Sequence, residues 1–158
     1  ATRAFDREGT PTRSLAILQR GALKAFLYDT YEARAAGAEP TGHAQGSASS
    51  PPAIGSSNLV LEPGDEAFAD LCCEPERAIV VSRFSGSCNP ITGEFSGVVK
   101  GGFLMRRGAR TPIKETLIAG SLFDALKNVS GVSKETRVIN GTRTMPSVRV
   151  EDVSVTAG

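Results

Sequence analysis

The sequence predicts an α+β fold, built mainly from antiparallel strands with about three short helices packed on them. Three observations support this class. Most apolar residues fall in short β-prone runs, these runs are separated by Gly-containing turns, and the apolar spacing becomes helical at only three places. Gly is frequent, at 17 of 158 residues. The pattern leaves open the strand order and whether the sheet closes into a barrel.

The longest β-prone stretch, Ser85–Gly120, organises the rest of the chain. After a turn-rich start it runs through Phe95–Met105, reverses at an Arg-Arg-Gly connection and returns through Ala109–Ile118. Two such runs joined by a short Gly-containing turn predict a long hairpin. Gly101 and Gly102 interrupt the first arm, which indicates a bulge or a close approach by another backbone.

The N-terminal part predicts a smaller hairpin and a helix. Ser14–Gln19 and Ala22–Tyr28 form the hairpin arms around an Arg-Gly reversal, with core contacts expected from Leu23, Phe26 and Leu27. The helix follows at once. Asp29 is a suitable N-cap, and Glu32 lies three residues on, as a capping box requires. Gly37 is a suitable C-terminal glycine.

Residues 38–57 are rich in Gly, Ser, Pro and Ala and nearly free of charge. This composition predicts a long loop, which is either a flexible surface excursion or a functional lid or rim. The only histidine, His43, lies here.

The remaining elements follow in order. A short strand at Asn58–Glu62, a helix from Asp65 through about Cys73 and a central strand at Ala78–Phe84 precede the long hairpin. After it we expect a helix capped by Ser121, running from Leu122 to about Val129 with an apolar stripe. Then come a strand at Lys134–Ile139, a turn at Asn140-Gly141, and a closing strand at Ser147–Thr156 with a kink at Glu151-Asp152.

The charge, the aromatic content, the lengths of the apolar runs and the cysteine count argue against several classes of protein. The net charge is +1 and the aromatic residues are two Tyr and seven Phe, so nucleic-acid binding is not expected. No apolar run approaches the ~20 residues that span a bilayer, and no secretory leader is visible. Three cysteines, two of them adjacent, make a poor disulfide framework and favour a reducing cytoplasm. The chain starts without Met, which suggests a processed chain or a fragment.

Catalytic motifs are missing from the sequence. It contains no HExxH, no CxxC pair, no GxGxxG and no phosphate-binding loop. His43 lacks a nearby partner ligand, Cys72-Cys73 fits a helix core, and Cys88 fits an exposed thiol without a base. Two charged groups allow two interpretations each. The basic group is either a solvated turn or a patch for an acidic partner, and it comprises Arg106, Arg107, Arg110 and Lys114. The acidic group is either a helix N-terminus or a pair of acids across a cleft, and it comprises Glu62, Asp65 and Glu66.

Several segments, in order, resemble the C-terminal domain of the TldD/PmbA family, whose members are often labelled modulators of DNA gyrase. They are DREGTPTRSLAILQRGALKAFLYDTYEARAAGAEPTGHA, NLVLEPGD, SGSCNPITGEFSGVVKGGFL, TPIKETLIAGSLFDALKN and PSVRVEDVSVTAG. The resemblance covers nearly all of residues 1–158, as one domain without the family's N-terminal domain. It implies cytoplasmic, dimeric or heterodimeric proteins linked to metal-dependent proteolysis of peptides and small unstructured proteins.

The resemblance also implies where zinc is bound. In the catalytic branch an HExxxH helix and a cysteine near the C-terminus supply the ligands, and the helix belongs to the N-terminal half. This chain has no HExxxH, and Arg137–Met145 reads RVINGTRTM without a cysteine. The chain is therefore more similar to the PmbA/TldE-like branch, with no catalytic or metal-binding residue of its own and zinc only in a partner subunit. Whether the chain belongs to an active enzyme stays open.

The expected function is to support proteolysis by a zinc-bearing family member, as a homodimer or heterodimer. An extended peptide substrate could add to an exposed strand through backbone hydrogen bonds. The expected substrate-binding residues are His43, Asn89, Gly86 and Gly93: the first two offer polar contacts, and glycines let a peptide backbone come close. The alternative is a structural or dimerisation module without a peptidase role.

Overall fold

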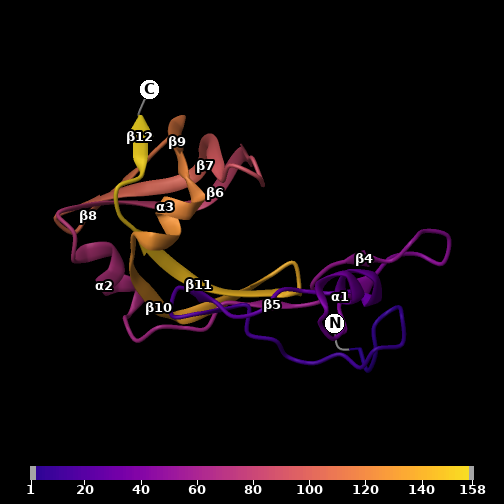
Figure 1. The fold of residues 1–158 in the computed structure, drawn as a ribbon. Coiled ribbons are helices and arrows are strands. Elements are labelled where there is room, and N and C mark those ends of the chain that lie inside the picture. Colours follow the sequence, from indigo (N-terminus) through magenta and orange to yellow (C-terminus); the bar gives the residue numbers. More distant parts are fainter. Residues whose placement is uncertain (1–2, 157–158) are drawn as a thin grey trace. The chain divides into compact units, whose positions relative to one another are not determined.

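The computed structural model describes residues 3–156, in two compact units (Figure 1). The first unit contains the chain up to Val60 together with Val138–Thr144. The second contains Leu61–Arg137 and the chain from Met145 onward. Strands are mostly antiparallel and three helices accompany them, so the predicted α+β class is confirmed.

The first unit is built from one helix and short two-residue strands. The hairpin β1–β2 and the pair β3–β4 are antiparallel, whereas β5 pairs in parallel with the start of β11. The elements are β1 (Leu18–Gln19), β2 (Ala22–Leu23), α1 (Thr30–Ala36), β3 (Ala44–Gln45), β4 (Ala53–Ile54) and β5 (Leu59–Val60).

The predicted first hairpin is confirmed, but its arms are much shorter than expected. Arg20 and Gly21 both have positive φ, 51° and 76°, as a two-residue reversal requires. Leu23 and Phe26 are 53% and 60% exposed, so the prediction that they contact the core is wrong. Two paired residues per arm bury little surface, whatever the apolar content of the flanking sequence.

Helix α1 is confirmed with both of its predicted ends. The Asp29 carboxylate accepts a hydrogen bond of 2.8 Å from the Glu32 amide, and Gly37 takes the left-handed conformation with φ 63°. The following segment, predicted as one long loop, contains the pair β3–β4, in which Ala44 pairs with Ile54. Its strands are too short to show a period in the sequence.

The second unit contains an antiparallel sheet of order β12-β9-β7-β6, with β8 also beside β7. Strands β12 and β6 end this order, and within residues 3–156 no ladder joins them, so the sheet is not closed into a barrel. The elements are α2 (Phe68–Cys73), β6 (Arg77–Cys88), β7 (Glu94–Arg106), β8 (Ala109–Pro112), β9 (Thr116–Ser121), α3 (Leu122–Lys127) and β12 (Ser154–Thr156).

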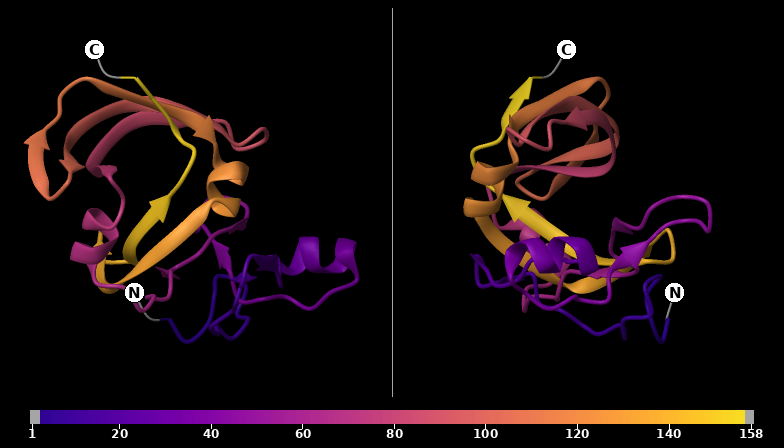
Figure 2. Two further views of the ribbon diagram at one scale, coloured as in Figure 1. Left: turned by 90° about the vertical axis from the view of Figure 1, so that its left-hand side faces the viewer. Right: turned by 45° about the vertical axis from the view of Figure 1, so that its right-hand side comes forward.

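Strands β10 (Val129–Ile139) and β11 (Arg143–Val150) are neighbours in a separate sheet, in the order β10-β11-β5 (Figure 2). The turn between them has positive φ at Asn140 and Gly141, 51° and 70°, as the sequence predicts. Strand β10 begins five residues before the predicted Lys134. The closing strand breaks between β11 and β12, which confirms the kink at Glu151-Asp152.

The predicted long hairpin is confirmed. Strand β7 pairs with β8 and then with β9, and Arg107 and Gly108 form the reversal with φ 49° and 80°. The glycine interruption is also confirmed, because the β6–β7 register shifts between Val81 and Phe84, opposite Gly101 and Gly102. A side chain at Gly102 would place its Cβ 2.4 Å from the Val80 carbonyl oxygen.

The prediction of Ala78–Phe84 as a central strand is wrong. These residues belong to β6, which lies at the edge of the sheet and continues through Ser85–Cys88, a segment predicted as turn. A β-branched run favours a strand, but it does not distinguish an edge from a centre, because either can have one apolar face.

The apolar spacing predicted that α2 and α3 are helices, but it predicted burial correctly only for α2. In α2, which begins at Phe68 rather than Asp65, Leu71 and Cys72 are buried as the helical spacing predicts. In α3 the Ser121 hydroxyl accepts from the Asp124 amide at 3.3 Å, which confirms the cap. The α3 stripe is nevertheless 43–54% exposed at Leu122, Phe123 and Leu126. No helix within residues 3–156 is long and apolar enough to cross a membrane.

Candidate functional site

The outer edge of β6 is the main candidate surface. This strand has 12 residues, and within residues 3–156 its one partner in the sheet order is β7. An unpaired edge presents a row of backbone N–H and C=O groups that can pair with another extended chain. Figure 1 shows β6 and β7 together near the loop that joins them.

The ladder indicates which backbone groups of β6 face outward. The Asn89 amide donates to the Glu94 carbonyl, so the pair Asn89/Glu94 is hydrogen-bonded across the two strands. Pairs in an antiparallel ladder alternate, and the next pair, Cys88/Phe95, is therefore of the non-bonded type. The backbone groups of Cys88, and of Gly86 two residues earlier, accordingly point away from β7.

Two of the predicted substrate-binding residues, Asn89 and Gly93, close the loop at the end of β6. The Asn89 side-chain oxygen accepts from the amides of Ile91 and Thr92 at 2.9 and 3.3 Å, and its carbonyl accepts from the Gly93 amide. Gly93 has φ 75°, and a Cβ there would lie 2.6 Å from the Phe123 ring. Both residues therefore have clear structural roles in shaping the edge.

Gly86 combines a structural role with a place on the free edge. It pairs with Gly97, and a Cβ at Gly86 would lie 2.3 Å from the Ser96 carbonyl oxygen. The absence of a side chain thus lets the two strands approach closely. The same residue leaves its outer backbone groups without a side chain beside them, which suits close approach by a peptide.

His43, the fourth predicted contact, belongs to the first unit, whereas the other three belong to the second. Its Nδ1 lies 3.0 Å from the Thr41 hydroxyl. Thr41 is buried, and its hydroxyl accepts from the Tyr28 amide and donates to the Tyr28 carbonyl. One ring nitrogen of His43 is therefore held within a local polar network.

Asp6, a buried polar anchor of the first unit, was not predicted from the sequence. Its buried carboxylate accepts from three backbone amides, those of Glu8, Thr10 and Ala44, at 2.9, 2.9 and 3.0 Å. It joins the N-terminal turn to β3. The signal available in the sequence is an Asp shortly before Gly and Pro, which is typical of side-chain-capped turns.

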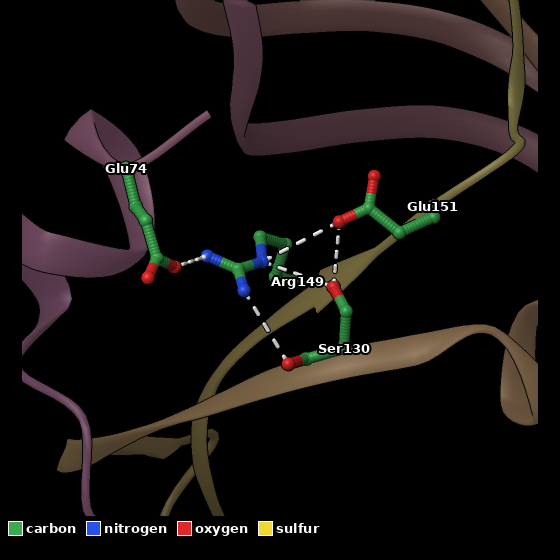
Figure 3. A network of polar contacts seen from close by, with 4 residues as sticks. All are labelled: Glu74, Ser130, Arg149 and Glu151. Atoms are coloured by element: carbon green, nitrogen blue, oxygen red, sulfur yellow. Dashed lines mark hydrogen bonds and ion pairs between the residues drawn. The ribbon is translucent and has the colours of Figure 1, made fainter. Parts of the chain in front are cut away.

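A second polar network, centred on Arg149, was also missed (Figure 3). Its guanidinium contacts Glu74 after α2 at 2.6 Å, Glu151 at 3.5 Å, and the Ser130 hydroxyl at 2.9 Å. The hydrogen bond that Arg149 donates to the Glu74 carboxylate is the main reason that the pKa of Arg149 is raised. This network connects α2, β10 and the end of β11, and it is structural rather than catalytic in geometry.

The basic group at the hairpin tip divides into two kinds of contact. Arg107 pairs with the exposed carboxylate of Glu76 at 3.0 Å, as expected for a solvated turn. The Arg110 guanidinium instead lies over the Phe103 ring, 3.8 Å from its centroid. The acidic residues Glu62, Asp65 and Glu66 all lie before the first residue of α2. The acidic residue within the first turn of this helix is Asp70.

The residues present do not fit a zinc site. Within residues 3–156, no three His, Cys, Asp or Glu side chains gather closely enough to hold a metal ion. Burial raises the pKa of the Cys72 thiol, which disfavours the thiolate that zinc needs. The Cys88 thiol donates weak hydrogen bonds to the carbonyl oxygens of Asn89 and Gly93, 3.7 and 3.9 Å away.

Comparisons with known proteins give a consistent result. Residues 1–157 match the family described as the PmbA/TldA metallopeptidase C-terminal domain. A metalloprotease of Methanothermobacter thermautotrophicus is 30% identical over 138 residues, 85% of this chain and 30% of the relative. The metalloprotease PmbA of Escherichia coli O157:H7 is 29% identical over 136 residues, 85% of this chain and 28% of the relative.

Solved structures agree with the sequence matches. TldE of Thermococcus kodakarensis superposes with a TM-score of 0.89 at 32% identity, over 99% of this chain and 36% of that protein. A proposed modulator of a DNA gyrase from Thermotoga maritima has a TM-score of 0.86 at 33% identity, over 98% and 35%. The chain thus spans about a third of the length of these relatives, and 28–30% of the two metalloproteases.

Proposed function

Since this chain belongs to the PmbA/TldD metallopeptidase family, as its C-terminal domain, we propose that it supports proteolysis without supplying zinc ligands. A zinc-bearing family member carries out the cleavage, and this chain holds an extended peptide or an unstructured protein segment. The assembly is a cytoplasmic homodimer or heterodimer. Likeness to a structure named TldE supports assignment to the branch without a zinc site.

The single observation that carries the proposal is the free edge of β6. Pairing through backbone groups accepts many sequences, which suits unfolded substrates. The outward backbone groups of Gly86 and Cys88 lie toward the end where Asn89 closes the loop. Register shifts between Val81 and Phe84 divide the edge into two regular segments, and the segment from Phe84 to Cys88 carries these outward groups.

The zinc chemistry is assigned to a partner because the possible zinc donors within residues 3–156 do not converge. Zinc in a protease polarises the scissile carbonyl and activates water. The residues of this chain would position the peptide relative to that centre. His43 is a further proposed contact, through the ring nitrogen that does not face Thr41.

The partner is tested by capture from cells. The protein that carries this chain is tagged in its own organism and purified, its partners are identified by mass spectrometry, and zinc is measured in the eluate. A zinc-loaded relative with an HExxxH helix is expected. Recovery of the protein alone and zinc-free would contradict the peptidase role.

The peptide edge is tested by removing one outward amide. Cys88→Pro removes the N–H that points away from β7 and leaves the β7-facing amides intact, as edge strands tolerate. We expect peptide cleavage by the reconstituted assembly to fall at least tenfold, with an unchanged thermal transition. Cys88→Val keeps the amide and is the matched control. Equal activity of the two variants would exclude the edge as the peptide site.

A structural or dimerisation module is the second candidate, favoured by the exposed apolar residues of α3 and by β12 at the other end of the sheet order. Under that function, self-association measured by analytical ultracentrifugation weakens on Leu126→Glu, while Cys88→Pro has no effect on cleavage. Charge reversal at Arg106 and Arg107 tests whether the hairpin tip also contributes.

A further inference from the structure

The second unit contains a cavity of about 360 Å³ that the proposed peptide edge does not use. Its apolar walls come from α2, β6 and β7, and two guanidinium groups also line it. The apolar residues are Phe68, Val80, Val81 and Phe103, and the cations are Arg110 and Arg137. Ser82 and Ser147 also line the cavity, so polar and apolar groups contribute about equally to its walls. A volume of several hundred Å³ is typical of small-ligand sites.

The charge in this cavity is of one sign. None of the lining residues is acidic, and within the described part of the chain neither Arg110 nor Arg137 forms an ion pair. Glu135, two residues before Arg137 on β10, accepts a hydrogen bond from the Phe68 amide at 2.9 Å. That hydrogen bond holds the Glu135 carboxylate at the start of α2, and its single negative charge is outnumbered by the two arginines. The two guanidiniums leave a surplus of positive charge, which favours an anion.

The contact of Arg110 with Phe103 indicates how it would bind. The centre of its guanidinium lies over the Phe103 ring, 3.8 Å from the centroid, and a cation–π contact does not use up the N–H donors. The fork of these donors matches the two oxygens of a carboxylate. The Phe103 ring meanwhile forms part of the apolar wall, so a charged group and an apolar group can be held side by side.

We propose that this cavity binds a carboxylate carried on an apolar group, with Arg110 and Arg137 as the donors and the walls of Phe68, Val80 and Phe103 around the apolar part. Such a ligand is either a small free acid or the C-terminal residue of a peptide. The second source would give the proposed protease assembly a contact for chain ends. The site itself does not depend on that function, because neither arginine belongs to β6.

Binding is measured by isothermal titration calorimetry on the full chain with N-acetyl-leucine as the probe. A ligand of this size with one ion pair is expected to bind with a Kd on the order of millimolar. N-acetyl-leucinamide, which lacks the charge, should bind at least tenfold more weakly. Equal binding of acid and amide, or no binding of the acid, would overturn the proposal.

Substitutions locate the site. Arg110→Gln and Arg137→Gln should each weaken acid binding at least tenfold, with unchanged circular dichroism. Arg106→Gln is the matched control, because it removes the same charge from the same hairpin outside the cavity. If the control weakens binding as much as the two cavity variants, only general charge attraction is at work and the cavity is not the site.

The source of the carboxylate is decided by a second pair of probes. A tripeptide ending in leucine that binds more tightly than N-acetyl-leucine, and loses this gain on C-terminal amidation, identifies a chain end. No gain identifies a small free acid. Cys88→Pro should leave binding of N-acetyl-leucine unchanged, so failure of the peptide edge and failure of this cavity are separate results.

Discussion

Arg149 makes more polar contacts than any other side chain discussed above, and it joins β11 to α2 and β10. Its loss should therefore lower the stability of the protein. We expect Arg149→Met to lower the free energy of unfolding by about 1–2 kcal/mol, because the Glu74 carboxylate and the Ser130 hydroxyl lose their shared partner. Urea denaturation measures this. Arg106→Met, which removes an exposed arginine of β7, is the control, and an equal loss in both variants would contradict a role for the network.

Cys72 provides a pH-dependent prediction. Burial, with a smaller contribution from Cys73, raises the pKa of its thiol. The folded state therefore holds this proton more tightly than the unfolded state. Its contribution to stability is complete below the unfolded thiol pKa, about 8.5, and is lost as the pH rises through the folded value. As the pH rises above about 8.5, Cys72→Ala should lose less stability than the unsubstituted chain, measured by denaturation at each pH.

Alkylation gives an independent measurement of the same difference. At pH 8, iodoacetamide should label the exposed Cys73 and Cys88 well before Cys72 in the folded chain. In urea all three should react at similar rates. Labelling of Cys72 as fast as its neighbour Cys73 without denaturant would show that the thiol is not shielded.

At the scale of the secondary-structure elements, two glycines in connecting turns have similar φ angles but different surroundings. Substituting each by alanine distinguishes the cost of backbone strain from the cost of steric contact. Gly93 and Gly108 have φ 75° and 80°, but a Cβ at Gly93 would meet the Phe123 ring whereas Gly108 faces open space. Gly108→Ala should cost about 1 kcal/mol of stability from backbone strain alone. Gly93→Ala should cost at least 1 kcal/mol more. Equal losses in thermal denaturation would mean that α3 does not pack on this loop.

Local signals predicted these elements well. The caps at Asp29 and Ser121 and the turn at Asn140 depend on neighbouring residues only, so the sequence contains the whole cause. The order of strands does not have a local cause. The edge position of β6 follows from which strands pair with β7, and a β-branched run looks the same in either place.

The candidate site was predictable only in part. Gly86, Asn89 and Gly93 stood out as glycine and turn residues, and all three do lie along the end of β6 or in the loop that follows it. Arg137 gave no signal, because one arginine in a strand becomes notable only when folding places it beside Arg110. Asp6 has a local turn signal, but its hydrogen bond from the Ala44 amide, far along the chain, has none.

For the whole molecule, the two units should differ in local stability. Strands β1 and β2 pair over two residues each and leave Leu18 and Leu23 exposed, whereas β7 is paired on both sides and buries Val99. In hydrogen–deuterium exchange, peptides from β7 should be protected much longer than peptides spanning β1 and β2. Comparable protection in the two regions would contradict this difference.

The open edge of β6 also affects how the protein behaves at high concentration. Unpaired strands can recruit further copies and seed fibrils, and charged side chains and irregular register are common defences against this. Arg77 and Arg83 place two positive charges on β6, and the register shifts between Val81 and Phe84 break its regularity. Between Phe84 and Cys88 the strand has no charged residue, so fibril growth, followed by thioflavin fluorescence, should start from that segment when the edge has no ligand.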